Sequence, residues 1–166
     1  MRVPFALLGL LLLGCGGCAS APVCPAVPAG FLAENTARDL DLLKAAYEEA
    51  GFEADWVKPG SAFWVSHDEM PGKVVVEVHA PSKAYRLAAV YRKKDDVKPS
   101  TMLFAQVNVL NAKGVVKAYV DEEGDFWTET FYPFREGVAR RSLMIHTRQF
   151  ARYSREAAGA LGDYLK

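Results

Sequence analysis

The chain has 166 residues, of which 51% are hydrophobic and 24% are charged. This length and composition suit one domain with a single hydrophobic core. Its 20 lysine and arginine residues balance its 20 aspartate and glutamate residues, and the lack of a basic excess argues against a dedicated nucleic-acid-binding protein.

The first eighteen residues, MRVPFALLGLLLLGCGGC, have the pattern of a localisation signal. Arg2 is followed by an apolar run over residues 3–13, which is shorter than the roughly 20 apolar residues that a membrane-spanning helix needs. A positive charge, a short apolar segment and a small residue, Gly14, are typical of a signal peptide. Because Cys15 comes next, the segment resembles the lipobox of bacterial lipoproteins, in which a diacylglycerol is attached to the cysteine and the peptide is cut before it.

The lipobox resemblance implies a signal peptide over residues 1–14 and attachment to a membrane through a lipid on Cys15. Several acyl chains on one cysteine are sufficient for stable anchoring. In bacteria with two membranes, an aspartate after the lipidated cysteine holds a lipoprotein at the inner membrane, so Gly16 favours the periplasmic face of the outer membrane. The alternatives are an ordinary secretory signal cut after Ala19 or Ala21, and an uncleaved anchor.

Residues 15–30 contain the lipidated cysteine and a proline-rich segment. Small residues alternate there with three prolines, which is typical of an extended tether, although a leader without a spacing role fits equally well. The cysteines Cys15, Cys18 and Cys24 all precede the folded domain, and the last two would be able to pair in an oxidising periplasm. No histidine lies near them to complete a zinc site, and we expect neither a metal nor a cofactor.

Residues 31–166 are predicted to fold as one domain. Thr36 and Asp39 resemble a capping box before a helix that Gly51 ends in a left-handed conformation. Strands are predicted at 52–57, 62–66, 73–79 and 85–92, the last of which also fits a helix. An apolar helix with Pro99 in its first turn follows. The next element is a hairpin of residues 115–120 and 126–132, closed by the acidic turn 121–125. A long amphipathic helix begins at residue 138, and its buried face is expected to comprise Leu143, Phe150, Tyr153, Ala157, Leu161 and Tyr164.

This order of elements predicts an α+β fold: an antiparallel sheet with helices at both ends of the chain and one in the middle (α-βββ(β)-α-ββ-α), with the helices packed on one face. The helix end Gly51-Phe52, the pair Leu110-Asn111 and the hairpin segment over residues 116–134 resemble the YbjN-type family of bacterial sensory transduction regulators. The resemblance covers about residues 33–161. It implies a fold like that of type III secretion chaperones, no enzymatic activity, and a plausible homodimer.

Five residues are predicted to bind a protein partner. Adjacent aromatic residues at Phe63-Trp64 and Phe126-Trp127 place one ring on each face of a strand. If helices cover one face only, the other exposes aromatic side chains, which often mark a partner-binding surface; helices on both faces are the alternative. The predicted partner-binding residues are Trp64, Trp127, Phe131, Arg148 and Arg152.

Both predicted arginines belong to a stripe on the last helix that also contains Arg141 and Arg155. A solvated helix face explains this stripe most simply, and contact with anionic lipid headgroups is the alternative.

The sequence contains none of the HExxH, GxSxG or P-loop motifs. His67 beside Asp68 and Glu69 offers half of a metal site, but a solvated loop explains the three residues better. His146 is expected to be buried and hydrogen-bonded rather than to act as a general base. The acidic turn lacks the spacing of an EF-hand. We therefore predict a non-enzymatic, membrane-anchored protein-binding module; an envelope-acting enzyme, whose polar cluster would assemble from distant positions, and a structural homodimeric lipoprotein are the alternatives.

Overall fold

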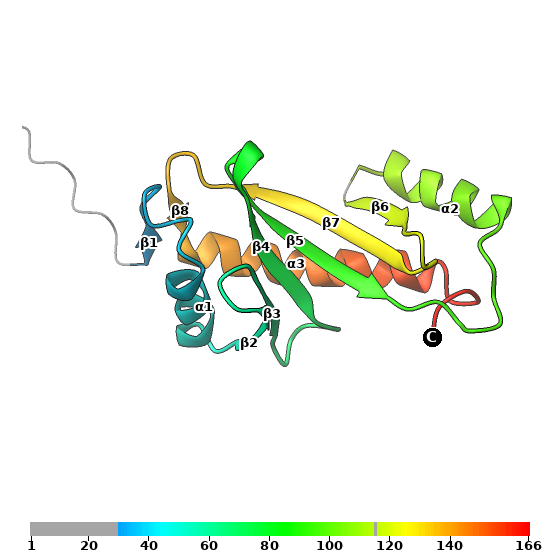
Figure 1. Ribbon diagram of the computed structural model, residues 1–166, viewed down its shortest axis with the longest axis horizontal. Helices are drawn as coiled ribbons and strands as arrows, with labels where there is room; N and C mark the ends of the chain where they lie inside the picture. The colour runs from blue at the N-terminus through cyan, green and yellow to red at the C-terminus, as the bar shows by residue number, and fades with distance from the viewer. Residues whose placement is uncertain (1–29, 115) are drawn as a thin grey trace, which may run out of the picture.

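The computed structural model describes residues 30–114 and 116–166. The predicted signal peptide, the lipidation site Cys15 and the tether up to residue 29 lie outside these residues. The described elements, in chain order, are β1 (Phe31–Leu32), α1 (Leu40–Glu49), β2 (Glu53–Lys58), β3 (Ala62–Ser66), β4 (Val74–His79), the 3-10 helix η1 (Ala80–Ser82), β5 (Ala84–Tyr91), α2 (Thr101–Ala112), β6 (Lys117–Val120), β7 (Phe126–Pro133), β8 (Val138–Ala139) and α3 (Arg140–Gly159) (Figure 1). The α+β prediction is confirmed.

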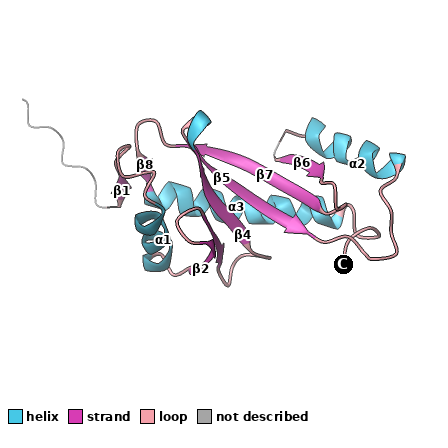
Figure 2. Cartoon of the chain, in the orientation of Figure 1, coloured by secondary structure: helices cyan, strands magenta, loops and turns pink. Residues whose placement is uncertain are grey.

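Six strands form one antiparallel sheet in the order β2-β3-β4-β5-β7-β6, and β1 pairs with β8 in a separate two-stranded sheet. The segment that fitted either a strand or a helix is the strand β5, which pairs with β7 from Ala84↔Pro133 to Tyr91↔Phe126. Figure 2 shows α3 running behind β4, β5 and β7 along most of the body. In the described part of the chain, no helix has the length and apolar composition needed to cross a bilayer.

The helices pack on one face of the six-stranded sheet, as predicted. Alternate residues of the strands, such as Phe63 and Leu87, point toward α1 and α3 and are fully buried. The hydroxyl groups of Tyr47 on α1 and Thr147 on α3 lie 2.7 Å apart in a buried hydrogen bond that joins the two helices. A smaller cluster forms where α2 and the end of the chain cover Phe126.

Two helix starts differ from the sequence-based expectation. Asp39, not Thr36, caps α1, because its carboxylate accepts hydrogen bonds from the backbone N–H groups of Asp41 and Leu42 at 3.0 and 3.1 Å. Thr36 donates instead to a carbonyl in the preceding turn. Ser100 caps α2, so Pro99 precedes this helix rather than occupying its first turn.

The expected cap at the end of α1 is confirmed, because Gly51 has a φ of +84°.

Two side chains of α3 also differ from expectation. Tyr153 is 44% exposed, whereas its neighbours Ser154 and Ala151 face the sheet and let α3 approach it closely. Ser154 accepts a hydrogen bond at 2.8 Å from the hydroxyl group of Thr128 on β7. His146 packs against the Tyr132 ring, but its buried Nε2 atom has no hydrogen-bond partner among the described residues. Burial lowers the pKa of His146, which therefore favours the neutral form.

Candidate functional site

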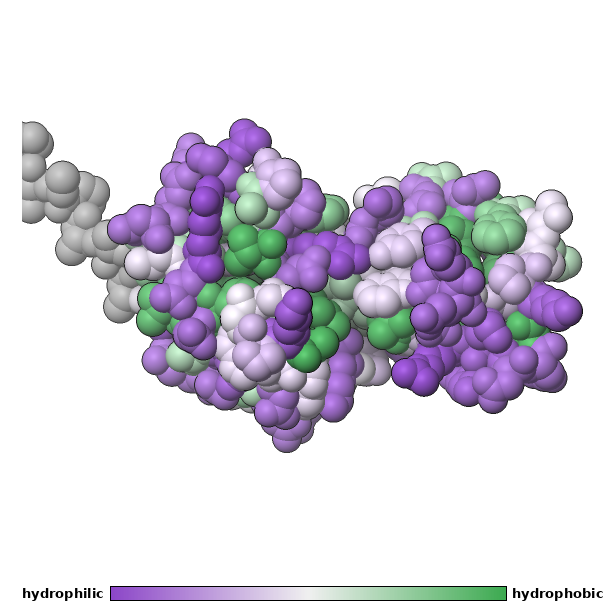
Figure 3. Space-filling model, in the orientation of Figure 1, coloured by the Kyte–Doolittle hydropathy of each residue, from purple (hydrophilic) through white to green (hydrophobic). Residues whose placement is uncertain are grey.

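The candidate functional site is the face of the six-stranded sheet that carries no helix, which we name the open face. Strand register places its residues in cross-strand rows: Trp64↔Val75↔Ala88↔Glu129↔Lys117, Glu77↔Arg86↔Phe131, and Val90↔Trp127↔Tyr119. Figure 3 looks onto this face, where apolar and aromatic residues lie between charged ones. Three of the five predicted partner-binding residues, Trp64, Trp127 and Phe131, share this surface.

The aromatic side chains of the open face are held in place by polar neighbours. The ammonium group of Lys73 lies 3.4 Å from the centre of the Trp64 ring. The indole N–H of Trp127 donates to Asp121 at 2.7 Å, and its ring stacks on Tyr119. Phe131 packs edge-on against His79 and remains 40% exposed. Rings fixed in this way lose little side-chain entropy when they bind a partner.

An ion-pair network occupies the centre of the open face. The Arg86 guanidinium donates to Glu77 at 2.8 Å, to Glu129 at 2.6 Å and to the Tyr119 hydroxyl at 2.9 Å. Lys117 donates to the second carboxylate oxygen of Glu129 at 2.7 Å. Strand pairing explains the contacts, because Glu77 lies directly opposite Arg86 and Lys117 lies directly opposite Glu129.

The two most buried members of the network stay charged. Burial alone would raise the pKa of Glu129, but hydrogen bonds from Lys117 and Arg86 outweigh burial and lower it. Burial likewise opposes the charge of Arg86, and its bonds to Glu77 and Glu129 outweigh burial and raise its pKa. Sequence reasoning missed this network, although charged residues inside strands of β-branched and aromatic residues were a signal for it.

The open-face network is a polar cluster assembled from distant positions, which is the arrangement an enzyme would require. Its members come from β4, β5, β6 and β7, but each charge is neutralised by an ion pair. A cavity of about 480 Å³ lies elsewhere, between α1 and α3. The network is therefore suited to fixing the shape of the open face rather than to acid–base chemistry.

The other two predicted residues lie in another layer of the fold. Arg148 on α3 pairs with Glu69 at 3.0 Å, contacts the His67 ring at 3.0 Å and lies over the Phe52 ring. Arg152 is exposed on the outer side of α3. The structure thus divides the predicted set between two surfaces.

The segment around His67 is a loop in which Asp68 and Glu69 are exposed, as expected, and His67 is half-buried. His67 and Glu69 hold Arg148 in place. In the described ranges, no cluster of three or more His, Cys, Asp or Glu side chains is arranged to bind a metal ion.

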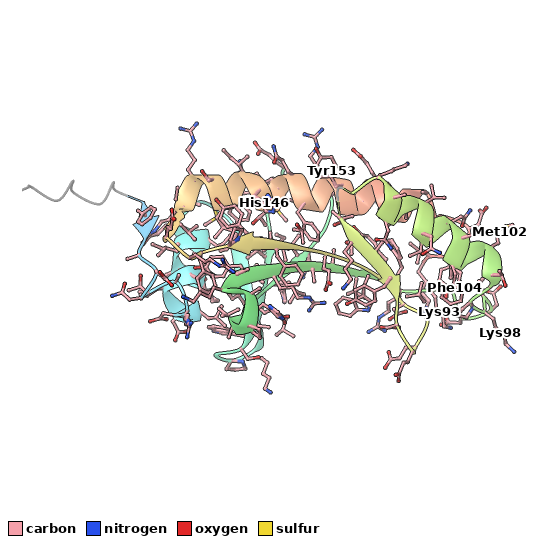
Figure 4. All side chains as sticks on the ribbon, turned by 90° about the horizontal axis from the view of Figure 1, so that it is seen from above. Lys93, Lys98, Met102, Phe104, His146 and Tyr153 are labelled. Atoms are coloured by element: carbon pink, nitrogen blue, oxygen red, sulfur yellow. The ribbon has the colours of Figure 1, made fainter. Side chains whose placement is uncertain are left out.

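A second exposed surface, which sequence reasoning missed, lies on α2. Only Leu103 and Val107 of this helix are buried, whereas Met102 is 67% exposed, Phe104 48% and Val109 59%. Figure 4 places Met102 and Phe104 at the end of the molecule farthest from α1. Apolar residues on all sides of an uncharged helix were the available signal, because such a helix is normally buried on all sides.

Asn111 protects the edge strand β6. Its side-chain amide donates to the backbone carbonyl of Ala118 at 2.8 Å and accepts from the backbone N–H of Ala118 at 2.7 Å. These two bonds occupy backbone groups that an added strand would otherwise use. They give a physical role to the Leu110-Asn111 pair noted in the sequence.

Two of the four acidic residues in the β6–β7 turn, Asp121 and Asp125, accept hydrogen bonds. The carboxylate of Asp121 accepts hydrogen bonds from the Asp125 backbone and from the Trp127 indole, and Gly124 has a φ of +89°. Asp125 in turn accepts from the backbone N–H of Lys93 at 3.0 Å. These contacts confirm a hairpin turn.

No protein-family model matches the chain, and no curated protein sequence matches it. Among solved structures, the crystal structure of YbjN, a candidate transcription regulator from E. coli, matches with a TM-score of 0.61 and 14% sequence identity. The match covers 76% of this chain and 95% of that one. At this identity the similarity establishes a YbjN-like fold, in agreement with the resemblance seen in the sequence.

Proposed function

We propose that this protein is a non-enzymatic lipoprotein whose YbjN-like domain binds a protein partner through the open face. In this proposal, a lipid on Cys15 attaches the chain to the membrane, and the proline-rich segment before Gly30 gives the domain its reach. In a host with two membranes, Gly16 supports a position on the periplasmic side of the outer membrane.

The observation that carries the proposal is the one-sided packing of the six-stranded sheet. Helices cover one face, whereas Trp64, Trp127 and Phe131 extend from the other. Aromatic and arginine side chains are enriched in protein interfaces, and tryptophan, tyrosine and arginine are enriched among binding hot spots. The matching partner would present apolar side chains at its centre, because the central charges of the open face are already paired.

A photo-crosslinking residue placed at Phe131 in the full chain, in intact cells, tests the open face. Position 136 is the matched control, because Glu136 is also exposed but lies in the turn after β7. We expect a discrete adduct with another protein from position 131 and none from position 136. Equal adducts from both positions, or none from either, would contradict the proposal.

The anchor is tested separately by Cys15→Ala. Membrane fractions should contain the wild-type chain and lose the variant, and the adduct from position 131 should disappear with the anchor. Mass spectrometry of the mature N-terminus provides the direct measurement, because lipidation predicts a modified Cys15. An unmodified N-terminus after Ala19 or Ala21 would instead indicate ordinary secretion.

The exposed face of α2 supports a second candidate, a homodimer. Met102 and Val109 share one side of α2 and Phe104 lies on another, so a second copy would have to cover more than one side of this uncharged helix. Sedimentation of the full chain in detergent should show a dimer that Phe104→Glu converts to a monomer. Phe104→Leu is the control, because it keeps an apolar side chain at the same position.

A further inference from the structure

The outer side of α3 carries a concentration of positive charge. This helix contains five arginines and a single acidic residue, Glu156. At 100° per residue, Arg141, Arg148, Arg152 and Arg155 fall within one narrow stripe. The stripe is about 21 Å long, since 14 residues separate its ends and each adds about 1.5 Å.

Most of this charge is not neutralised within the described part of the chain. Arg148 pairs with Glu69, and the neighbouring Arg140 pairs with Glu49. Arg141, Arg152 and Arg155 are exposed and form no ion pair with any residue in 30–114 or 116–166. The open face differs in this respect, because the charges of its central network are paired.

One exposed apolar side chain lies among the arginines of the stripe. Ile145, between Arg141 and Arg148 along α3, is 46% exposed, whereas Tyr153 lies on the flank of α3 toward α2, beside Leu110 and Val116. The apolar face of α3 packs against the sheet, so contact of this helix with a membrane would rest on its arginines, with Ile145 as an added apolar contact. The cavity between α1 and α3 adjoins the same end of the stripe and is bordered by Arg140, Arg141 and Arg148.

The N-terminal segment leaves the body at the beginning of this stripe. The carbonyl group of Gly30 accepts a hydrogen bond at 2.7 Å from the backbone N–H of Arg140, the first residue of α3. If Cys15 carries the lipid, the 14 residues from 16 to 29 reach at most about 45 Å in an extended proline-rich conformation. The stripe would therefore remain within reach of the membrane surface.

We propose that the arginine stripe of α3 binds the anionic phosphate headgroups of the membrane that holds the chain. The helix would lie along the bilayer surface with Ile145 at the interface. The open face, on the opposite side of the fold, would then point away from the membrane toward its partner. The orientation rests on the proposed lipid anchor, whereas the attraction between arginines and anionic lipid does not.

Tryptophan fluorescence of the full chain, reconstituted in vesicles that contain brominated lipid, tests the proposal. Ile145→Trp reports on the stripe, and Val90→Trp, on the open face, is the matched position; the unsubstituted chain gives the baseline of its native tryptophans. One vesicle contains phosphatidylcholine alone and the other adds phosphatidylglycerol. We expect quenching of the residue at 145 only with phosphatidylglycerol, and its loss in about 1 M salt.

Charge reversal of Arg141, Arg152 and Arg155 to glutamate should abolish this quenching. Reversal of Lys58, Lys98 and Arg135, which are exposed elsewhere, changes the net charge equally and should preserve it. For chains that are not lipidated, the affinity for phosphatidylglycerol vesicles should fall at least 100-fold on reversal of the stripe, since each arginine near an anionic surface strengthens binding about fivefold.

Equal quenching at position 145 with both vesicles would overturn the proposal, because the tether alone would then bring the body to the bilayer. No quenching with either vesicle would also overturn it and would favour a solvated stripe or an acidic protein ligand. Cosedimentation of the chain with vesicles distinguishes failure of the lipid anchor from failure of the arginine stripe. A chain without lipid would not sediment with phosphatidylcholine vesicles. Its sedimentation with phosphatidylglycerol vesicles would still test the arginines.

Discussion

Replacing Asn111 by alanine tests the protection of the edge strand β6. The substitution removes two hydrogen bonds to the Ala118 backbone, of 2.7 and 2.8 Å. At about 1 kcal/mol each, their loss should cost about 2 kcal/mol. Alanine favours a helix over asparagine by about 0.6 kcal/mol, so the net loss should be close to 1.4 kcal/mol.

Asn108→Ala is the matched control, because it makes the same chemical change about one turn earlier in α2, at an exposed residue. Asn108→Ala should gain the same stability of about 0.6 kcal/mol from the higher helix propensity of alanine, without losing the two hydrogen bonds to Ala118. The two variants should therefore differ by about 2 kcal/mol in the free energy of unfolding, measured in urea. For a domain of this size, that difference corresponds to about 7 °C in Tm.

Hydrogen exchange of the Ala118 amide provides a local measurement. Asn111→Ala should accelerate exchange of the Ala118 amide by more than its loss of global stability accounts for. The exposed edge of β6 should also promote association between chains. Equal stability of the two alanine variants, with unchanged exchange at Ala118, would refute the idea that Asn111 protects this strand.

Three further predictions concern the two faces of the sheet and its N-terminal attachment. Phe63→Ala should destabilise the domain by about 4 kcal/mol in urea unfolding, whereas Phe131→Ala should cost less than about 1 kcal/mol because its ring is partly exposed; similar losses would contradict the assignment of the faces. The stability that Glu129 gains from its lowered pKa should be complete above the ordinary glutamate pKa of about 4.3 and be lost as the pH falls through the folded-state value. Acid titration should show a weaker dependence in Glu129→Gln, and an unchanged slope would count against the network. Gly137→Ala should release β1 to proteolysis, because Gly137 has a φ of +89° and a Cβ atom would overlap the Phe31 ring; unchanged protease resistance would show that the overlap is relieved elsewhere.

Much of the fold was predictable because hydrophobic periodicity records which side of an element is buried. The alternation in β5 identified a strand, and the structure confirms that Tyr85, Leu87 and Ala89 face the core. The hairpin was predictable from local turn chemistry around Gly124. Tyr153 was assigned to the buried face because its large aromatic side chain is a stronger apolar signal than its small neighbours. In the structure, the small residues Ala151 and Ser154 face the sheet instead.

The candidate site was predictable only in part. Adjacent aromatic pairs indicated that one ring of each pair leaves the core, but only the arrangement of helices decides whether that second face is covered. Arg86 pairs with Glu129 because β5 and β7 are adjacent in the sheet, although α2 and β6 separate them in the sequence. Arg148 and Arg152 were grouped with the tryptophans because charge and aromaticity carry no information about which layer a residue occupies.

The small β1–β8 sheet determines how the domain would respond to mechanical force. Any pull through the segment before Gly30 first reaches β1, which is held by two residue pairs with β8 and by the bond from Arg140 to the Gly30 carbonyl. The large sheet and α1 share no strand with this attachment. Under load, β1 would detach first, and the nine residues before α1 would then extend to a total of at most about 30 Å. The β1–β8 attachment would thus separate at a lower force than the six-stranded sheet, and the open face would keep its shape.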